Sequence, residues 1–244
     1  MVRETLGNLT FAACAALALG ACGSIVPTGP GGGASARAPS SDATGSTRAS
    51  PRRVTSAPRG VAERPEIRAC IGDLNAAGAR FSALADQYGA PGCNVLGAVR
   101  LSSLTGDQGD FGVSNLGPVK CELANTFGEW ARFGVDRAAR QILGSPLARI
   151  ETMGSYACRN IGGSNRRSAH ARAAAIDVSA FVLADGRRVT LAQDWNGGTA
   201  AEREFLRVVQ ASACKRFGTV LGPEYNRAHH DHFHLEDPGR RFCR

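Results

Sequence analysis

Residues 168–183, SAHARAAAIDVSAFVL, contain an apolar stretch that one carboxylate interrupts. The segment Ala174–Leu183 is almost entirely apolar, which predicts a buried strand. Asp177 lies inside it between Ile176 and Val178, and a carboxylate is costly to bury unless it is paired, hydrogen-bonded or bound to a metal. An Asp that closes a turn or pairs with a nearby Arg is the alternative interpretation. His170 precedes Asp177 by seven residues and is a candidate partner.

A second segment, AHHDHFHLE at 228–236, holds four of the five histidines of the chain. We predict a strand over His232–Leu235. Because alternate residues of a strand share a face, His232 and His234 would point one way, and Phe233 and Leu235 would point into the core. The alternative is a polar edge strand or a His-rich turn.

His170, Asp177 and a histidine of the second segment together make a candidate metal site. Three protein ligands with an open fourth position are typical of catalytic zinc. Neutral imidazoles with one carboxylate suit Zn²⁺ better than Ca²⁺ or Mg²⁺, which prefer shells of oxygen atoms.

The rest of the pattern predicts an α+β fold, in which helices flank a small antiparallel sheet. Apolar spacing predicts helices over Ile67–Leu84, Leu123–Leu143 and Ala200–Phe217. Asp185-Gly186 is a hairpin turn signal, and the Gly- and Asp-rich stretch Gly106–Gly117 is expected to be a loop. Further strands are expected over Asn94–Leu101, Arg149–Cys158, Arg188–Leu191 and Thr219–Leu221.

Residues 1–22 have the pattern of an export signal. Arg3 precedes the short apolar stretch Leu6–Leu19, which ends in Leu19-Gly20-Ala21-Cys22. This ending resembles a bacterial lipobox, so we predict that Cys22 is lipidated; a plain signal peptide with a chance Cys is the alternative. Gly23, rather than an Asp, follows Cys22, which favours the outer membrane by analogy with retention signals.

Residues 23–62 consist mainly of Gly, Pro, Ser, Thr and Ala and contain no aromatic residue. Such a composition predicts a disordered tether, with a mean span of roughly 35 Å as a flexible coil. The globular domain is expected over 63–244. Half of the net charge of +8 falls in the tether, so the basic composition does not by itself indicate nucleic-acid binding, and we predict no nucleic-acid partner. The oligomeric state stays open.

The cysteines predict an oxidising compartment. Cys14 leaves with the signal and Cys22 is the lipidation site, so six remain for the domain. An even number in an exported domain predicts three disulfides, although sequence leaves fifteen pairings open. Pairing neighbours in order predicts Cys70–Cys93, Cys121–Cys158 and Cys214–Cys243.

Two motifs of this chain resemble those of known enzymes. Ser-x-His-x6-Asp followed by His-x-His is similar to the zinc D-Ala-D-Ala carboxypeptidases, D-Ala-D-Ala dipeptidases and murein endopeptidases of peptidoglycan. More closely, 63–244 resembles the bacterial extensin-like C-terminal domain family. The matching strings are GSYACR (154–159), 168–177, LADGR (183–187), VLGPEYN (220–226) and DHFH (231–234).

The resemblance implies a zinc-peptidase-like, disulfide-bonded fold in which His170, Asp177 and His234 are the zinc ligands. It also implies that His232 or His229 transfers protons, without a choice between them. Arg159 is implied to hold the tetrahedral oxyanion or a substrate carboxylate, with a surface Arg as the alternative.

The expected function is zinc-dependent hydrolysis of peptidoglycan peptides, of endopeptidase or carboxypeptidase type, by a lipid-anchored periplasmic protein of the bacterial envelope. Ala173 stands where the family usually has Gly, three residues after His170. If that position requires a positive φ, Ala173 strains the loop between two ligands. A non-catalytic wall-binding or scaffold lipoprotein that retains the metal pocket is therefore the alternative function.

Overall fold

The computed structural model describes residues 64–237 and 241–244. The expected signal at 1–22, the lipidation site Cys22 and the tether at 23–62 lie outside the described residues. Within the described ranges, no helix has the length and apolar character that crossing a bilayer requires.

Four α-helices occur in the described part of the chain: α1 (Pro65–Ala76), α2 (Cys121–Glu129), α3 (Leu191–Gly197) and α4 (Ala200–Cys214). The helix predicted over 67–84 is too long, because the chain turns at Gly78, which has a φ of 77°, and then enters a strand. The helix predicted over 123–143 is present, since π-helical turns η1 (Trp130–Asp136) and η2 (Ala139–Leu143) continue α2 as far as Gly144. Gly144 ends it in the left-handed region that favours glycine.

The main sheet has ten strands and is mixed, so the prediction of a small antiparallel sheet is wrong. Its path runs β1-β4-β5-β7-β8-β11-β10-β12, with β6 beside β4 and β9 beside β8. The bounds are β1 (Arg80–Ala83), β4 (Ala98–Thr105), β5 (Asp110–Ser114), β6 (Val119–Lys120), β7 (Leu147–Gly154), β8 (Ala175–Leu183), β9 (Arg188–Thr190), β10 (Thr219–Leu221), β11 (Phe233–Glu236) and β12 (Phe242–Cys243). A separate hairpin pairs β2 (Gln87–Tyr88) with β3 (Asn94–Val95).

Two pairs of strands are parallel: β5 with β7, and β10 with β12. The connection from β5 to β7 contains β6 and the long helix 121–143, and a crossover of that length is what allows two strands to pair in parallel. The prediction of a loop over Gly106–Gly117 is wrong for Asp110–Ser114, which form β5. The alternate residues Phe111 and Val113 of this strand point into the core. The α+β class itself is confirmed, with a larger sheet than expected.

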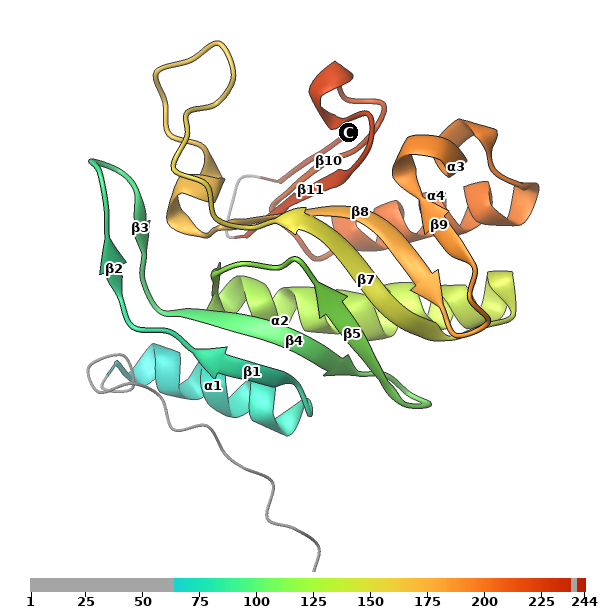
Figure 1. The fold of residues 1–244 in the computed structure, drawn as a ribbon, viewed down its shortest axis with the longest axis horizontal. Helices are drawn as coiled ribbons and strands as arrows, with labels where there is room; N and C mark the ends of the chain where they lie inside the picture. Colours follow the sequence, from blue (N-terminus) through green and yellow to red (C-terminus); the bar gives the residue numbers. More distant parts are fainter. Residues whose placement is uncertain (1–63, 238–240) are drawn as a thin grey trace, which may run out of the picture. The chain divides into compact units, whose positions relative to one another are not determined.

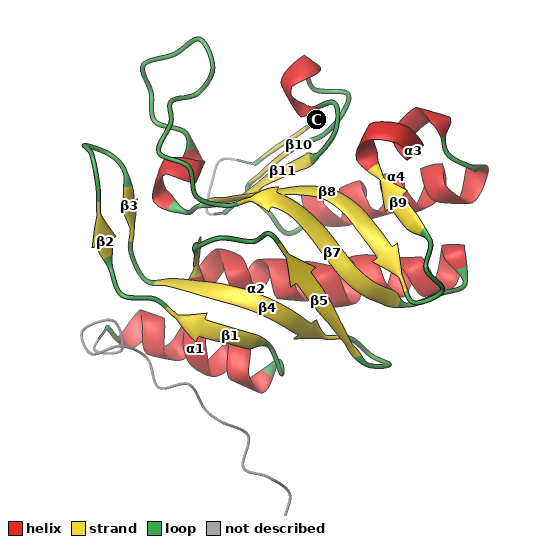
Figure 2. Ribbon diagram, in the orientation of Figure 1, coloured by secondary structure: helices red, strands yellow, loops and turns green. Residues whose placement is uncertain are grey.

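Helices α2 and α4 cover the inner face of the sheet (Figures 1 and 2). Trp130 packs edge-on against Phe181 of β8, and Phe181 packs edge-on against Phe205 of α4. The Trp130 indole also donates a hydrogen bond of 3.1 Å to the carbonyl of Val209. This apolar layer packs against one face of β8 and β11, which leaves their other face to carry polar side chains.

Three disulfides form, two of them with partners that the neighbour order did not predict. The structure pairs Cys70 with Cys121 and Cys93 with Cys158, so the predictions Cys70–Cys93 and Cys121–Cys158 are wrong. Packing of α1 against α2 brings Cys70 to Cys121, and the β2–β3 hairpin reaches the segment after β7. The predicted Cys214–Cys243 pair is confirmed. The bonds are consistent with an extracytoplasmic location.

Candidate metal centre

Three side chains from separate elements converge on one point. His170 lies on the 3-10 helix η3 (Ala169–Arg172), Asp177 on β8 and His234 on β11. One ligand atom from each lies within 4.8 Å of the other two, and all three residues are buried. His234 lies 57 residues after Asp177 and 64 residues after His170, so only the folded chain creates the cluster.

The sheet places Asp177 and His234 side by side. In the antiparallel pair of β8 and β11, His234 lies directly opposite Asp177, so both side chains project from the same face. Their neighbours Ile176, Val178 and Phe233 all pack into the core on the other face. The predicted direction of His234 is therefore confirmed, and Asp177 Oδ1 accepts a hydrogen bond of 2.8 Å from its Nδ1.

His170 is oriented by the backbone around it. The Ser168 hydroxyl accepts a hydrogen bond from the His170 backbone N–H and caps the short helix. The His170 Nδ1 donates to the carbonyl of Ser155 at 2.8 Å, which leaves Nε2 facing the cluster. His170 Nε2 lies 3.1 Å from Asp177 Oδ2 and 3.1 Å from His234 Nδ1.

His234 faces the cluster with Nδ1, whereas His170 faces it with Nε2. Its Nε2 donates a hydrogen bond of 2.7 Å to Glu236 Oε1, so Nδ1 is the atom that faces Asp177 and His170. Carboxylate and carbonyl partners of this kind fix the tautomer and ring direction of metal-bound histidines. Glu236 was not among the predicted site residues, although its place two residues after His234 on one strand face is visible in the sequence.

The electrostatics of the cluster follow from its hydrogen bonds. Burial would raise the pKa of the Asp177 carboxyl, yet hydrogen bonds from His170 and His234 hold it well below its ordinary value. Burial disfavours the charged form of His234, but hydrogen bonds to Asp177 and Glu236 outweigh this effect and raise its pKa to about 9. The site therefore keeps a carboxylate ionised inside the protein and holds positive charge next to it.

The donor set fits a small divalent ion. Ligand atoms about 2.0–2.1 Å from a tetrahedral zinc lie about 3.3 Å apart, close to the separations of 2.8–3.1 Å among these three. Two imidazole nitrogens and one carboxylate oxygen are ligands of zinc and of neighbouring transition metals rather than of calcium. The three residues could therefore hold such an ion after a small outward adjustment.

His232 lies at the edge of the cluster, on the same side as His234. Its side chain is 10% exposed, and its Nε2 lies 3.6 Å from Asp177 Oδ1. Its Nδ1 hydrogen-bonds at 2.9 Å to Oδ1 of Asp231, a partner that sequence analysis did not identify. Asp231 thus orients the ring so that Nε2 points at the candidate metal position.

His229 also faces the cluster, from the short helix η4 (Arg227–His229). Its ring packs against the rings of His232 and His234 at centroid distances of 5.2 and 5.7 Å, and Asn226 Oδ1 lies 2.7 Å from its Nδ1. Burial, together with the charges of His232 and His234, lowers the pKa of His229 to about 4. His229 is therefore neutral at pH 7 and able to accept a proton.

Arg159 lies in the loop after β7 rather than on a strand. The strand predicted over 149–158 ends at Gly154, and Arg159 is exposed. Its charge contributes to the low pKa of His229, so the guanidinium acts on the same side of the molecule as the histidines. The Cys93–Cys158 disulfide anchors the loop immediately before it.

Ala173 has a positive φ, which is the condition under which we expected it to strain the loop between His170 and Asp177. Its φ is 53° and its ψ is 29°, in the left-handed region, where a non-glycine residue costs about 1–2 kcal/mol. The residue is fully buried and packs with Val95 and Ala98, and its carbonyl accepts a hydrogen bond of 2.9 Å from the N–H of Lys120. These contacts hold the loop between His170 and Asp177 despite the strain.

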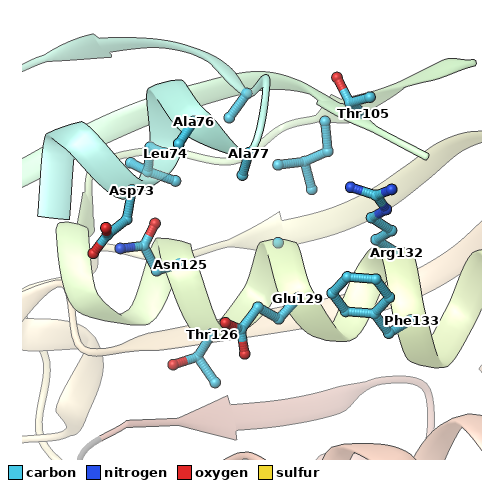
Figure 3. Close-up of a pocket in the computed structure, with 13 residues that line it drawn as sticks. Asp73, Leu74, Ala76, Ala77, Thr105, Asn125, Thr126, Glu129, Arg132 and Phe133 are labelled. Atoms are coloured by element: carbon cyan, nitrogen blue, oxygen red, sulfur yellow. The ribbon is translucent and has the colours of Figure 1, made fainter. Parts of the chain in front are cut away.

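A cavity of about 440 Å³ between α1 and α2 does not share residues with the cluster (Figure 3). Figure 3 shows Arg132 and Phe133 at one end of it and Asp73 and Asn125 at the other. Its amide and guanidinium groups already have partners, since Asn125 Nδ2 donates to the Cys70 carbonyl and Arg132 Nε donates to an Asp107 carboxylate oxygen. We assign it no chemistry.

Comparison with known proteins agrees with the resemblance inferred from the motifs. A family model described as extensin-like protein C-terminus matches residues 68–244. No curated protein and no solved structure matches this chain significantly.

Proposed function

Because the chain belongs to the extensin-like protein C-terminus family over residues 68–244, and because His170, Asp177 and His234 converge, we propose that it is a zinc-dependent hydrolase of peptide bonds in peptidoglycan. The observation that carries the proposal is the position of His232. A buried imidazole fixed by Asp231 points its Nε2 at the metal position, where a group that moves protons is needed.

Each residue of the site has a part in this proposal. His170 Nε2, Asp177 and His234 Nδ1 would hold the ion, which would supply Lewis acidity when bound. His232 Nε2 would accept a proton from the attacking water and return it to the leaving amine, and Asp231 would stabilise the ring while it is charged. His229, neutral at pH 7, is the second candidate for this step.

Arg159 would act on the substrate rather than on the metal. Its exposed guanidinium can bind a developing oxyanion or a terminal carboxylate with a permanent charge and a planar fork of donors. The loop that carries it is linked to the β2–β3 hairpin by the Cys93–Cys158 bond, which limits how far the guanidinium can move.

The substrate and location are proposed from the sequence together with the disulfides. A lipid anchor at Cys22, a tether over 23–62 and an oxidised domain would hold the enzyme at the bacterial outer membrane, within reach of the periplasmic cell wall. Peptidoglycan is the polymer in that compartment whose peptides the related zinc peptidases cut.

Metal analysis and wall digestion test the proposal with the purified full chain. We expect about one zinc per chain, and we expect His170→Ala and Asp177→Ala to lose it. His230→Ala is the matched control, because His230 is exposed, belongs to the same segment and lies outside the cluster. Wild type and the control should release the same new muropeptides from purified wall. Full zinc occupancy in both ligand variants would refute the ligand assignment.

A non-catalytic wall-binding lipoprotein is the second candidate, and the strained conformation of Ala173 favours it. A loop under strain between two ligands is compatible with binding a wall peptide without turning it over. His232→Ala separates the two functions, because it leaves the three metal ligands intact. If both proteins bind wall and both yield identical digests, binding without catalysis is the function.

A further inference from the structure

An open groove of about 150 Å³ lies beside the metal cluster. Met153 of β7, Ser179 of β8, Arg188 of β9 and Asp231 are among the residues that line it. Asp231 belongs to both places, since its carboxylate also accepts the hydrogen bond of His232. The groove therefore begins next to the side chain that we propose for proton transfer.

A β-bulge brings the groove and the cluster onto the same face of the sheet. The partners of β7 pass from Glu151 opposite Ala180 to Thr152 opposite Val178, so Ser179 is the extra residue. Val178 and Phe181 both pack into the core, which leaves Asp177 and Ala180 on the outer face. Bulges of this kind commonly lie next to active sites, where they redirect a side chain.

Arg188 is the cation at the far end of the groove. Arg188 donates to Glu151 Oε2 at 2.8 Å, and Arg149 donates to Glu151 Oε1 at 2.8 Å, so two cations share one carboxylate. The Arg188 side chain is 52% exposed, and its Nη1 has no hydrogen-bond partner among the described residues. Arg149 is similarly exposed, at 45%, but does not line the groove.

The distance along β8 between the Arg188 guanidinium and the His170, Asp177 and His234 cluster determines how long a ligand must be to contact both. Glu151 lies opposite Ala180, three residues along β8 from Asp177. At about 3.3 Å per residue this is at most about 10 Å, because Ser179 is bulged, and an extended peptide spans that length in about three residues. A ligand that lies along β8 with its reacting bond at the cluster would reach Arg188 with a group about three residues away.

We propose that Arg188 binds a carboxylate of an extended peptide substrate, about three residues from the bond that is hydrolysed. The inference rests on the proposed function and specifies its substrate class. Nη1 of Arg188 supplies free donors for the carboxylate, and the exposed thioether of Met153 supplies apolar contact for the residues between. Asp231 at the near end repels an acid next to the reacting bond.

Peptide binding to the metal-free full chain tests this without turnover. The probes are Ala hexapeptides with one Glu at each position in turn, each compared with the matching Gln peptide by NMR titration. We expect one Glu position to bind roughly tenfold tighter than its Gln counterpart, the scale of one charged hydrogen bond. Arg188→Gln should abolish this preference, and Arg149→Gln should retain it.

The control separates recognition from general surface charge. Arg149→Gln removes the same charge from the same carboxylate, so an equal loss in both variants would overturn the proposal, as would a wild type without any preference for Glu. A preference for the Glu peptide that is lost in Arg188→Gln but kept in Arg149→Gln supports the proposal, independently of the result of the peptidoglycan digestion. If the protein hydrolyses peptidoglycan but shows no preference for Glu over Gln peptides, the proposed function stands and the proposed role of Arg188 is refuted.

Discussion

Zinc binding should depend steeply on pH, because the ion competes with a proton on His234. In the metal-free protein Asp177 takes a hydrogen bond from Nδ1 and Glu236 takes one from Nε2, so the ring carries both protons. The pKa of His234 is about 9 as a result. A metal ligand must be deprotonated, so binding has to release the proton on Nδ1.

The size of the effect follows from the pKa of His234. At pH 7, about two units below a pKa of about 9, only about 1% of the rings are free of the proton, which weakens binding by about 2.7 kcal/mol. The dissociation constant should fall about tenfold per pH unit as the pH rises toward 9, and about one proton should leave per ion bound at pH 7.

Calorimetric titration with a competing chelator measures both quantities. Repeating the titration in two buffers that differ in ionisation enthalpy yields the number of protons released. Glu236→Gln should lower the pKa of His234, so it should release fewer protons at pH 7 than the wild type. Glu224→Gln is the control, because Glu224 is exposed and pairs with Arg207 on the surface.

Two results would contradict this reasoning. A dissociation constant that stays level between pH 6.5 and 8.5 would show that His234 is neutral in the metal-free protein. Zinc binding without proton release at pH 7 would also show that His234 is neutral in the metal-free protein. It would not contradict the assignment of His234 as a ligand.

Four further perturbations bear on stability. In the metal-free protein the folded pKa of His234, about 9, lies above its ordinary value of 6.5. Its contribution, on the order of 3 kcal/mol, is therefore complete below pH 6.5 and lost as the pH rises through about 9, which urea unfolding with a chelator at pH 6 and 9.5 measures. Ala173→Gly should stay within about 1 kcal/mol of wild type, because relief of the left-handed strain offsets the lost methyl and the added unfolded-state entropy. Ala173→Val should lower the free energy of unfolding by about 2 kcal/mol or more, since a β-branched residue tolerates that conformation poorly, and an unchanged melting temperature would contradict the observed φ. Replacing Cys93 and Cys158 by Ser should cost about 4 kcal/mol, because that bond closes a chain segment of 65 residues, as thermal unfolding can measure.

Local patterns predicted the elements that carry the site. The continuous apolar run around Asp177 and the His-apolar alternation around His234 predicted β8 and β11 to within one residue at each end. The same logic failed at β5, where Gly and Asp residues flank only a few apolar positions. It also failed for the end of α1, where a single positive φ at Gly78 stops a helical pattern.

The order of residues along the chain was enough to single out His170, Asp177 and the His-x-His segment, because a carboxylate inside an apolar strand and a His-x-His alternation are unusual wherever they occur. The choice of His234 as the ligand came from the family resemblance. Only the tertiary structure decided that Asp177 faces His234 across two strands, that opposite nitrogens of the two histidines face one point, and that Cys93 bonds Cys158. Those facts depend on strand register, on a long crossover helix and on backbone carbonyls such as that of Ser155. Such contacts join residues tens of positions apart, so no local periodicity records them.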